Sequence, residues 1–228
     1  METATLADVW IVVPAYNEDQ VVRDVVSSLL QHYDNVVVVD DNSNDCTHEC
    51  LAGLPVHLLR HPINLGQGAA LQTGITYALK CGAGVIITFD SDGQHAVEDI
   101  PALCRALSDG ADVALGSRFL GETIRMPSVR RLVLKAAIWY QWMTSGLKLT
   151  DAHCGLRAMT AATARRILIR ENRMAHASEL IEQFAKLKLE IAEVPVTIAY
   201  SEYSLSKGQS SLNAISIFLQ LFVHRFRK

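Results

Sequence analysis

The stretch VVVVDDNSNDCT, residues 36–47, is a run of valines that ends in two adjacent aspartates. Consecutive β-branched residues predict a strand buried on both faces, as in a parallel sheet. Polar turn and cap formers follow, and that role explains Asn44 and Asp45 well. It explains Asp40 and Asp41 poorly, because adjacent acids repel each other unless something donates hydrogen bonds to them. A bound ribose or a base N–H would do so.

Short apolar runs alternate with amphipathic segments on both sides of this stretch, which predicts an α/β fold with a mostly parallel central sheet flanked by helices. We expect strands at residues 9–13, 36–39, 56–59, 85–89, 112–115 and 191–198. We expect helices at residues 19–31, 67–80, 98–107, 128–143 and 178–187. Residues 116–118 should form a turn after the fifth strand.

The length of 228 residues, half of them hydrophobic, suits one domain with an appendage. We expect that domain over residues 1–210 and an amphipathic C-terminal helix over 211–228. The last segment places Phe218, Phe222 and Phe226 beside terminal cations, a pattern typical of a helix in a membrane interface. Packing on the domain or in a dimer is the alternative.

Composition excludes several classes of protein. The formal charge of −3 gives no global reason to bind nucleic acid. Five cysteines, an odd number, favour reduced thiols over a disulfide framework. Cys46, His48 and Cys50 lack a second ligand pair, which disfavours a zinc site. The sequence shows no signal peptide and no membrane-spanning run, so we expect a cytoplasmic protein.

The segment DSDGQH, residues 90–95, follows the strand expected at 85–89. Mg²⁺ and Mn²⁺ prefer carboxylate oxygens and commonly bind a diphosphate while keeping few protein ligands. Asp90 and Asp92 form a short D-x-D turn that would supply such an open site. The same tripeptide is often a solvated turn, but ligands of open α/β sheets bind at the carboxyl ends of strands. We therefore expect Mg²⁺ or Mn²⁺ here.

The segment NLGQGAALQTG, residues 64–74, follows the third strand and contains three glycines. They either let the backbone approach a ligand or let a helix pack close to the sheet. No G-x-G-x-x-G follows the first strand, which disfavours a dinucleotide site.

The motifs together form an ordered set that resembles the inverting glycosyltransferases of family 2. The set is VVPAYNE (12–18), VVVVDDNSNDCT (36–47), NLGQGAALQTG (64–74), DSDGQH (90–95) and GSRF (116–119). TDAHCGLRAM, residues 150–159, is most similar to the branch of dolichol-phosphate mannose synthases and polyprenyl-phosphate glycosyltransferases. The resemblance covers about residues 9–200 and implies a GT-A, Rossmann-like fold. This chain departs from many relatives at Gln67, where they carry a basic residue.

The resemblance also implies a set of site residues. The base and ribose pocket would be lined by Pro14, Ala15, Tyr16, Glu18 and Asp41. The metal and the diphosphate would be surrounded by Asp90, Asp92 and Gln94. Arg118 would approach the donor or acceptor phosphate, and Asp151 matches the acid proposed as catalytic base. Capping of the turn after Thr150 is the structural alternative for Asp151.

The implied reaction moves a sugar, with inversion, from a UDP or GDP sugar to an acceptor, while the metal neutralises the departing diphosphate. A polyprenyl or dolichyl phosphate is already largely ionised at neutral pH, so Asp151 would mainly position groups. A sugar hydroxyl would require Asp151 as a base.

A basic stretch begins the helix expected at 128–143 and consists of Arg125, Arg130, Arg131 and Lys135. A solvated helix start is one interpretation of this stretch. Cations are poorly placed at a helix N-terminus unless an anion is near, so we expect Arg131 to meet a lipid phosphate. Lys207 lies in a Gly/Ser-rich segment that could close over phosphates or be an ordinary mobile linker. We expect peripheral contact with the inner face of a membrane and leave a homo-oligomer open.

Three other functions are weighed against this one. Transfer to a soluble saccharide or protein hydroxyl would leave the C-terminal helix packed on protein. A non-catalytic nucleotide-sugar binder would bind the donor without reaction. A nucleotidyltransferase is disfavoured, because no basic glycine-rich loop follows the first strand.

Overall fold

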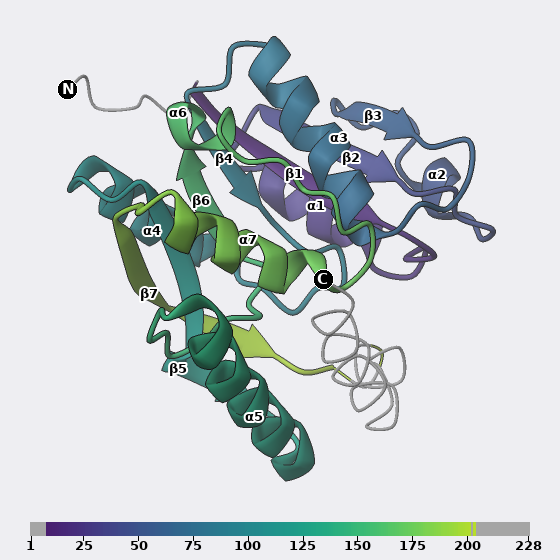
Figure 1. The fold of residues 1–228 in the computed structure, drawn as a ribbon. Coiled ribbons are helices and arrows are strands. Elements are labelled where there is room, and N and C mark those ends of the chain that lie inside the picture. The colour runs from purple at the N-terminus through teal and green to yellow at the C-terminus, as the bar shows by residue number, and fades with distance from the viewer. Residues whose placement is uncertain (1–7, 202, 204–228) are drawn as a thin grey trace.

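The computed structural model describes residues 8–201 and 203 (Figure 1). Within these residues one seven-stranded sheet has the order β3-β2-β1-β4-β6-β5-β7. The strands are β1 (Val9–Ala15), β2 (Asn35–Asp40), β3 (His57–Arg60), β4 (Val85–Thr88), β5 (Val113–Ile124), β6 (Arg157–Thr160) and β7 (Ile191–Ala199). The helices are α1 (Val22–Leu30), α2 (Thr47–Cys50), α3 (Gln67–Lys80), α4 (Ile100–Ser108), α5 (Ser128–Ser145), α6 (Ala161–Ala164) and α7 (His176–Lys186), with a 3₁₀ turn at Val97–Asp99.

Strand pairing confirms the expected α/β class with a mostly parallel sheet. β1 pairs in parallel with both β2 and β4, and β2 pairs in parallel with β3. β6 runs antiparallel to β4 and β5, while β5 and β7 are parallel. The carboxyl ends of β1, β2 and β4 therefore meet at one edge of the sheet.

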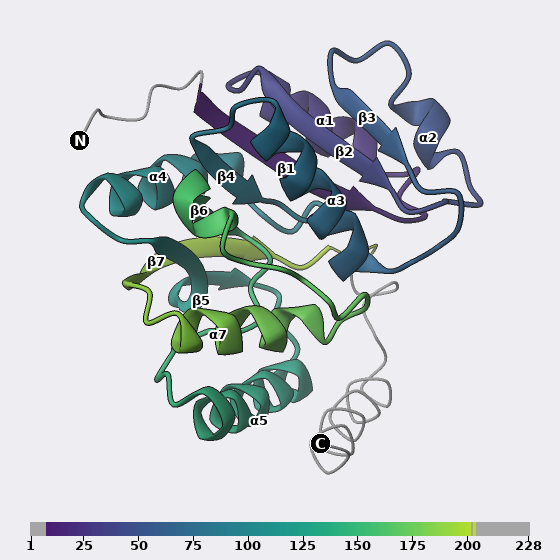
Figure 2. The same cartoon turned by 45° about the horizontal axis from the view of Figure 1, so that its top comes forward.

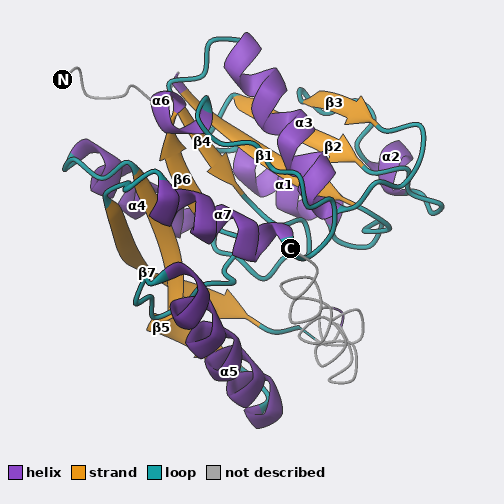
Figure 3. Ribbon diagram, in the orientation of Figure 1, coloured by secondary structure: helices purple, strands orange, loops and turns teal. Residues whose placement is uncertain are grey.

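Each face of the sheet carries its own apolar core. One core joins Ile11 and Val38 to α1 and α4. The other joins Val12 and Val37 to α3 and α7, which lie in front of the strands in Figure 3. Because successive strand residues point to opposite faces, strands covered on both sides become continuous apolar runs, as β1 and β2 do.

One sequence-based expectation about the strands is wrong, and one strand was missed. Residues 116–118 lie inside β5 and not in a turn, because an irregularity between Ser117 and Glu122 lets β5 continue beside β7. β6 was not expected at all. A strand of four residues is too short to show the alternation of apolar and polar residues that identifies a strand. Arg157 also interrupts the apolar pattern, although its side chain is buried.

Helix boundaries differ from expectation mainly at N-termini. α3 spans residues 67–80 as expected. α1 begins at Val22 and not at residue 19, because the Glu18 carbonyl accepts hydrogen bonds from Val21 and Val22 and forms a turn first. α7 begins two residues earlier than expected, at His176.

α5 is the longest helix of the described part, and it packs against α7 on the side of the molecule away from β3 (Figure 2). No helix in residues 8–201 is both long and apolar enough to cross a bilayer. The helix expected over 211–228 and Lys207 lie outside the described residues.

Candidate active site

The turn after β4 is organised by Asp92. Its carboxylate accepts hydrogen bonds from the backbone N–H of Gln94 at 3.0 Å and from the Gln94 side-chain amide at 2.8 Å. Ser91 donates to the carbonyl of Pro14 at 2.8 Å, which ties this turn to the end of β1. The predicted metal residues Asp90, Asp92 and Gln94 therefore lie together beside the first strand.

Asp90 lies at the centre of this edge. Its carboxylate accepts from the Gln67 amide at 2.9 Å and contacts His95 Nε2 at 3.3 Å. Desolvation alone would raise the pKa of Asp90, but the His95 hydrogen bond and nearby positive charges outweigh it and lower that pKa. A Cβ at Gly155 would overlap an Asp90 oxygen, so only glycine allows this approach.

Asp92 has the opposite electrostatic environment. Burial and the negative charge of Asp90 raise the pKa of Asp92 to about 6. Two crowded carboxylates of this kind suit a divalent cation, whose charge would remove their repulsion. Within residues 8–201 no group of three or more His, Cys, Asp and Glu side chains is arranged to hold a metal ion.

Asp41 and Asp40 find their donors within the protein. Asp41 accepts from the backbone N–H groups of Leu65 at 3.0 Å and Gly66 at 2.6 Å, and His61 Nδ1 lies 2.7 Å away. Asp40 accepts from Ser43 N at 2.8 Å and forms an ion pair with Arg60 at 3.2 Å. No ligand is needed to explain two adjacent buried acids. Asp41 shapes the loop that leads into α3.

The two polar loops after β1 and β2 are joined to each other. The backbone N–H of Glu18 donates to Thr47 Oγ1 at 2.7 Å, and that of Asn17 donates to Ser43 Oγ at 2.9 Å. Pro14 and Ala15 are buried in β1, whereas Tyr16 is exposed at its end. The residues predicted to line a base and ribose pocket are therefore contiguous, with one exposed aromatic ring among them.

The glycines of residues 64–74 serve packing within the protein. A Cβ at Gly74 would overlap the Val12 side chain, so Gly74 lets α3 lie close to the sheet. A Cβ at Gly68 would overlap the carbonyl of Glu171. Of the two alternatives left open by the sequence, close packing of the helix on the sheet accounts for Gly74, whereas Gly68 lets α3 approach the segment that contains Glu171.

A second polar cluster lies around Asp151, which is fully buried. Asp151 Oδ2 accepts from Arg118 Nε at 2.5 Å and from the Arg118 backbone at 3.2 Å. Burial would lower the pKa of Arg118, but Asp151 more than compensates and raises it, so Arg118 stays charged. Arg118 also donates to the Tyr200 hydroxyl at 2.9 Å. The geometry makes Asp151 the group that orients Arg118.

The segment before Asp151 is held by Glu193 of β7. One Glu193 oxygen accepts from Thr150 N at 2.7 Å, Thr150 Oγ1 at 2.6 Å and Asp151 N at 3.1 Å. The capping alternative for Asp151 is met by a turn: Asp151 Oδ1 accepts from the backbone N–H of His153 at 3.1 Å, while no helix of the described residues begins beside it.

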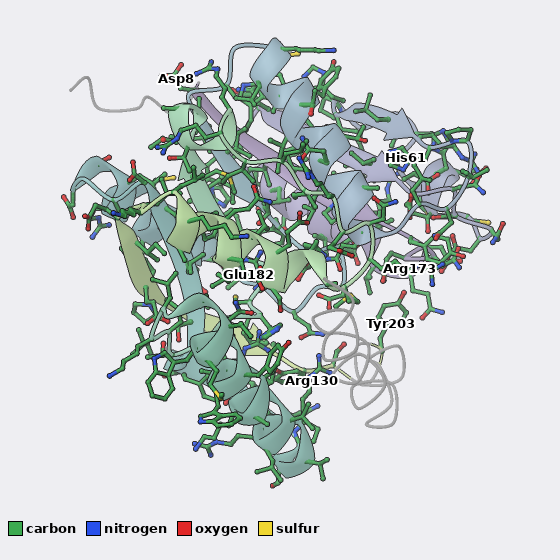
Figure 4. All side chains as sticks on the ribbon, in the orientation of Figure 1. Asp8, His61, Arg130, Arg173, Glu182 and Tyr203 are labelled. Carbon is green, nitrogen blue, oxygen red and sulfur yellow. The ribbon has the colours of Figure 1, made fainter. Side chains whose placement is uncertain are left out.

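Arg130 of α5, labelled in Figure 4, contacts this cluster. Its guanidinium lies 5.0 Å from the centre of the Tyr200 ring. Arg131, which the sequence singled out, is exposed on α5. Arg130 and Arg131 are consecutive, so their side chains point about 100° apart around the helix axis. The sequence alone did not reveal which face of α5 packs on the rest of the domain.

Sequence reasoning also missed the buried groups beneath Asp90. Arg157 donates to the carbonyl of Cys154 at 2.9 Å, and burial lowers the pKa of His153 and of His176 to about 4 each. Burial raises the pKa of Cys154 to about 12, so its thiol is not a nucleophile at neutral pH. The sequence signal that could have revealed these buried groups was Arg157, an arginine inside a short apolar run.

A mostly parallel α/β sheet with acidic and basic side chains gathered at its carboxyl edge is an architecture of nucleotide-dependent enzymes. The sequence profile of glycosyl transferase family 2 matches residues 10–171. The chain belongs to glycosyl transferase family 2 and is a glycosyltransferase. This confirms the resemblance noted in the sequence.

Two similar proteins match over most of both chains. A UDP-N-acetylglucosamine–dolichyl-phosphate N-acetylglucosaminyltransferase of Methanococcus voltae is 30% identical over 96% of this chain and 97% of its own. An undecaprenyl-phosphate mannosyltransferase of Micrococcus luteus is 31% identical over 86% of this chain and 85% of its own.

A solved structure shares the fold. Glucosyl-3-phosphoglycerate synthase of Mycobacterium tuberculosis, in complex with Mn²⁺ and UDP-glucose, has a TM-score of 0.70 and 21% sequence identity. The match covers 94% of this chain and 78% of that one. The GT-A fold expected from the sequence is confirmed.

Proposed function

We propose that this enzyme transfers a sugar, with inversion, from a UDP or GDP sugar to a polyprenyl or dolichyl phosphate, with Mg²⁺ or Mn²⁺, at the cytoplasmic face of a membrane. The observation that carries the proposal is the pairing of two sites at one edge of the sheet. Crowded acids, Asp90 and Asp92, lie at the end of β4, and a buried, permanently charged Arg118 lies on β5. Relatives named for lipid-phosphate acceptors support the acceptor class.

The donor would lie over the joined loops after β1 and β2. Tyr16 offers a ring for the base, beside Pro14, Ala15 and Glu18. A carboxylate has about four acceptor positions, and Asp41 uses three of them on His61, Leu65 and Gly66. It would thus contribute at most one contact to a ribose and would mainly fix the shape of the pocket.

Asp90, Asp92 and Gln94 would hold the divalent ion, which would neutralise charge on the departing diphosphate. Gln67 orients Asp90 through its 2.9 Å hydrogen bond, and His95 contacts the other carboxylate oxygen. These contacts fix the carboxylate before the substrate arrives, which is the preorganisation that electrostatic catalysis requires.

The acceptor phosphate would meet Arg118, with Arg131 and Lys207 as further cations. Asp151 engages Arg118 with one oxygen and the His153 backbone N–H with the other, at 3.1 Å. A phosphate acceptor is ionised at neutral pH and needs no base. An Asp151 that orients Arg118 is therefore sufficient for this reaction.

Transfer assays with labelled UDP and GDP sugars test the proposal. We expect product with a polyprenyl phosphate, loss of product on chelation of the metal, and recovery with Mn²⁺. Product with a soluble saccharide or protein hydroxyl instead would replace the acceptor assignment. Donor binding without transfer or hydrolysis would leave a non-catalytic binder.

A further inference from the structure

The outer face of α5 carries an unusual exposed apolar stripe. Its members are spaced by three or four residues and so lie on one side of the helix: Val129, Leu132, Ala136, Trp139 and Met143. Leu132 is 72% exposed and Trp139 is 57% exposed. A contiguous apolar surface of this kind on a folded domain marks an interaction site.

The opposite face of the same helix is already used. Gln141 is fully buried on that side, and the helix packs on α7. The stripe therefore is not the side that attaches α5 to the domain. α5 projects from the body formed by the described residues (Figures 1 and 2). The exposure of Leu132 and Trp139 places the stripe on a side of α5 that the other described residues leave uncovered.

The charges on α5 identify the partner. The helix contains Arg130, Arg131 and Lys135 and no aspartate or glutamate. Arg131 and Lys135 are exposed, and helical geometry places both along one border of the stripe. Lys148, just beyond the helix, lies 5.3 Å from the centre of the Trp142 ring. Tryptophans and cations that border an apolar stripe match the interface of an anionic bilayer.

We propose that α5 is the element through which this protein docks on an anionic phospholipid surface, its apolar stripe inserted and its cations at the headgroups. This inference rests on the proposed function in one respect: docking would bring the site to its lipid acceptor. The docking helix leads directly to the candidate acceptor site, because Arg130 stacks on Tyr200 and Tyr200 accepts from Arg118. A second copy of the chain is the competing occupant.

Intrinsic fluorescence reports on α5 in the unchanged chain. The protein has three tryptophans, of which Trp10 is buried and stacked on His57, while Trp139 and Trp142 are exposed on α5. With vesicles of phosphatidylglycerol and phosphatidylcholine that lack any polyprenyl phosphate, we expect a blue shift and quenching by brominated lipid. Flotation with vesicles but no quenching would overturn the proposal, as would absence of binding.

Paired variants test the stripe directly. Leu132→Glu should lower partition onto these vesicles at least tenfold, whereas Leu168→Glu, at an exposed leucine outside α5, should leave it unchanged. Lys135→Gln should lower partition about fivefold, the effect of roughly one surface cation, and less at high salt. Equal binding by the Leu132 and Leu168 variants would refute the proposal.

Two further readouts separate this inference from the others. Sedimentation that shows a dimer dissolved by Leu132→Glu, with vesicle binding unchanged, would assign the stripe to a second copy. Transfer to a short, water-soluble polyprenyl phosphate tests the proposed function without vesicles. The proposal that α5 docks on a membrane and the proposal of a lipid-phosphate acceptor can therefore be refuted independently of each other.

Discussion

At the scale of single residues, the site is defined by acids whose environments differ. Asp90 has a lowered pKa because His95 and nearby positive charges outweigh desolvation, whereas burial and Asp90 raise the pKa of Asp92 to about 6. At neutral pH and without a bound cation, the negative charges of Asp90 and Asp92 therefore repel each other in the folded protein. Destabilised groups of this kind are typical of functional sites.

We expect Asp92→Asn, without metal at about pH 7.5, to be more stable than the unchanged chain by on the order of 1 kcal/mol. The pKa of Asp92 is higher in the folded chain than its ordinary value, so the folded state loses stability as the pH rises from about 4 to about 6. Asparagine does not ionise, so the variant does not lose this stability as the pH rises. Melting temperatures at about pH 4.5 and 7.5 should show the difference between the proteins shrinking at the lower pH.

Addition of Mn²⁺ completes this test. The ion should raise the melting temperature of the unchanged chain at pH 7.5 but not that of Asp92→Asn, and transfer by the variant should fall by about 100-fold or more. Equal stabilisation of both proteins by Mn²⁺ would place the ion elsewhere.

A second prediction concerns Gly155. Gly155→Ala should lower transfer at least tenfold, because the new methyl group would push Asp90 away from its place. Gly82→Ala is the matched control, since Gly82 has open space around it but a φ of 91°. It should cost about 1 kcal/mol of stability and leave transfer per folded molecule unchanged. Equal activity of the two variants would contradict the role assigned to Gly155.

At the scale of elements, the proposed acceptor site is built by three separate segments. β5 supplies Arg118, the segment before β6 supplies Asp151, and the end of β7 leads to Tyr200. None of these contacts is local in sequence: Arg118 and Tyr200 are separated by 82 residues. Their assembly depends on the antiparallel β6, which brings the 150–156 segment alongside β5.

Tyr200→Phe tests this assembly with little change in packing. The variant keeps the ring beneath Arg130 and removes only the hydroxyl that Arg118 donates to. We expect KM for the lipid phosphate to rise about three- to tenfold, the effect of one lost hydrogen bond, with KM for the donor unchanged. Asp151→Asn should raise the acceptor KM further without moving the pH profile. A lost acidic limb in that profile would instead show that Asp151 acts as a base.

The sequence predicted elements where local pattern was sufficient. α3 carries a clear apolar stripe, and its limits at residues 67 and 80 were predicted correctly. β6 and the continuation of β5 depend on pairing with distant strands, which no local period reveals. The same limit applies to the site: the motifs located Asp41, but its donors His61 and Gly66 come from a loop 20 or more residues away.

At the scale of the whole molecule, the proposed function divides the sheet in two: one half would serve the donor and the adjoining half would serve the acceptor. The β3-β2-β1-β4 half carries the joined loops and the acid pair, while the β6-β5-β7 half carries Arg118 and Asp151. α5 extends from the second half (Figure 1). A membrane met by α5 would thus lie on the acceptor side, and the donor side would remain open to water.

This division of the sheet predicts the effect of removing residues 211–228. Both apolar cores that the structure describes are built from residues 9–200, so we expect the truncated protein to melt cooperatively and to bind donor normally. Its partition onto anionic vesicles should fall but persist, because α5 remains, and truncation combined with Leu132→Glu should abolish it. Because the binding free energies of two independent contacts add, the fold-reductions in vesicle partition caused by the truncation and by Leu132→Glu should multiply. Flotation and melting curves on the four proteins decide the matter: a truncated chain that no longer floats at all assigns the contact to residues 211–228, and one that fails to fold shows that this segment completes the domain.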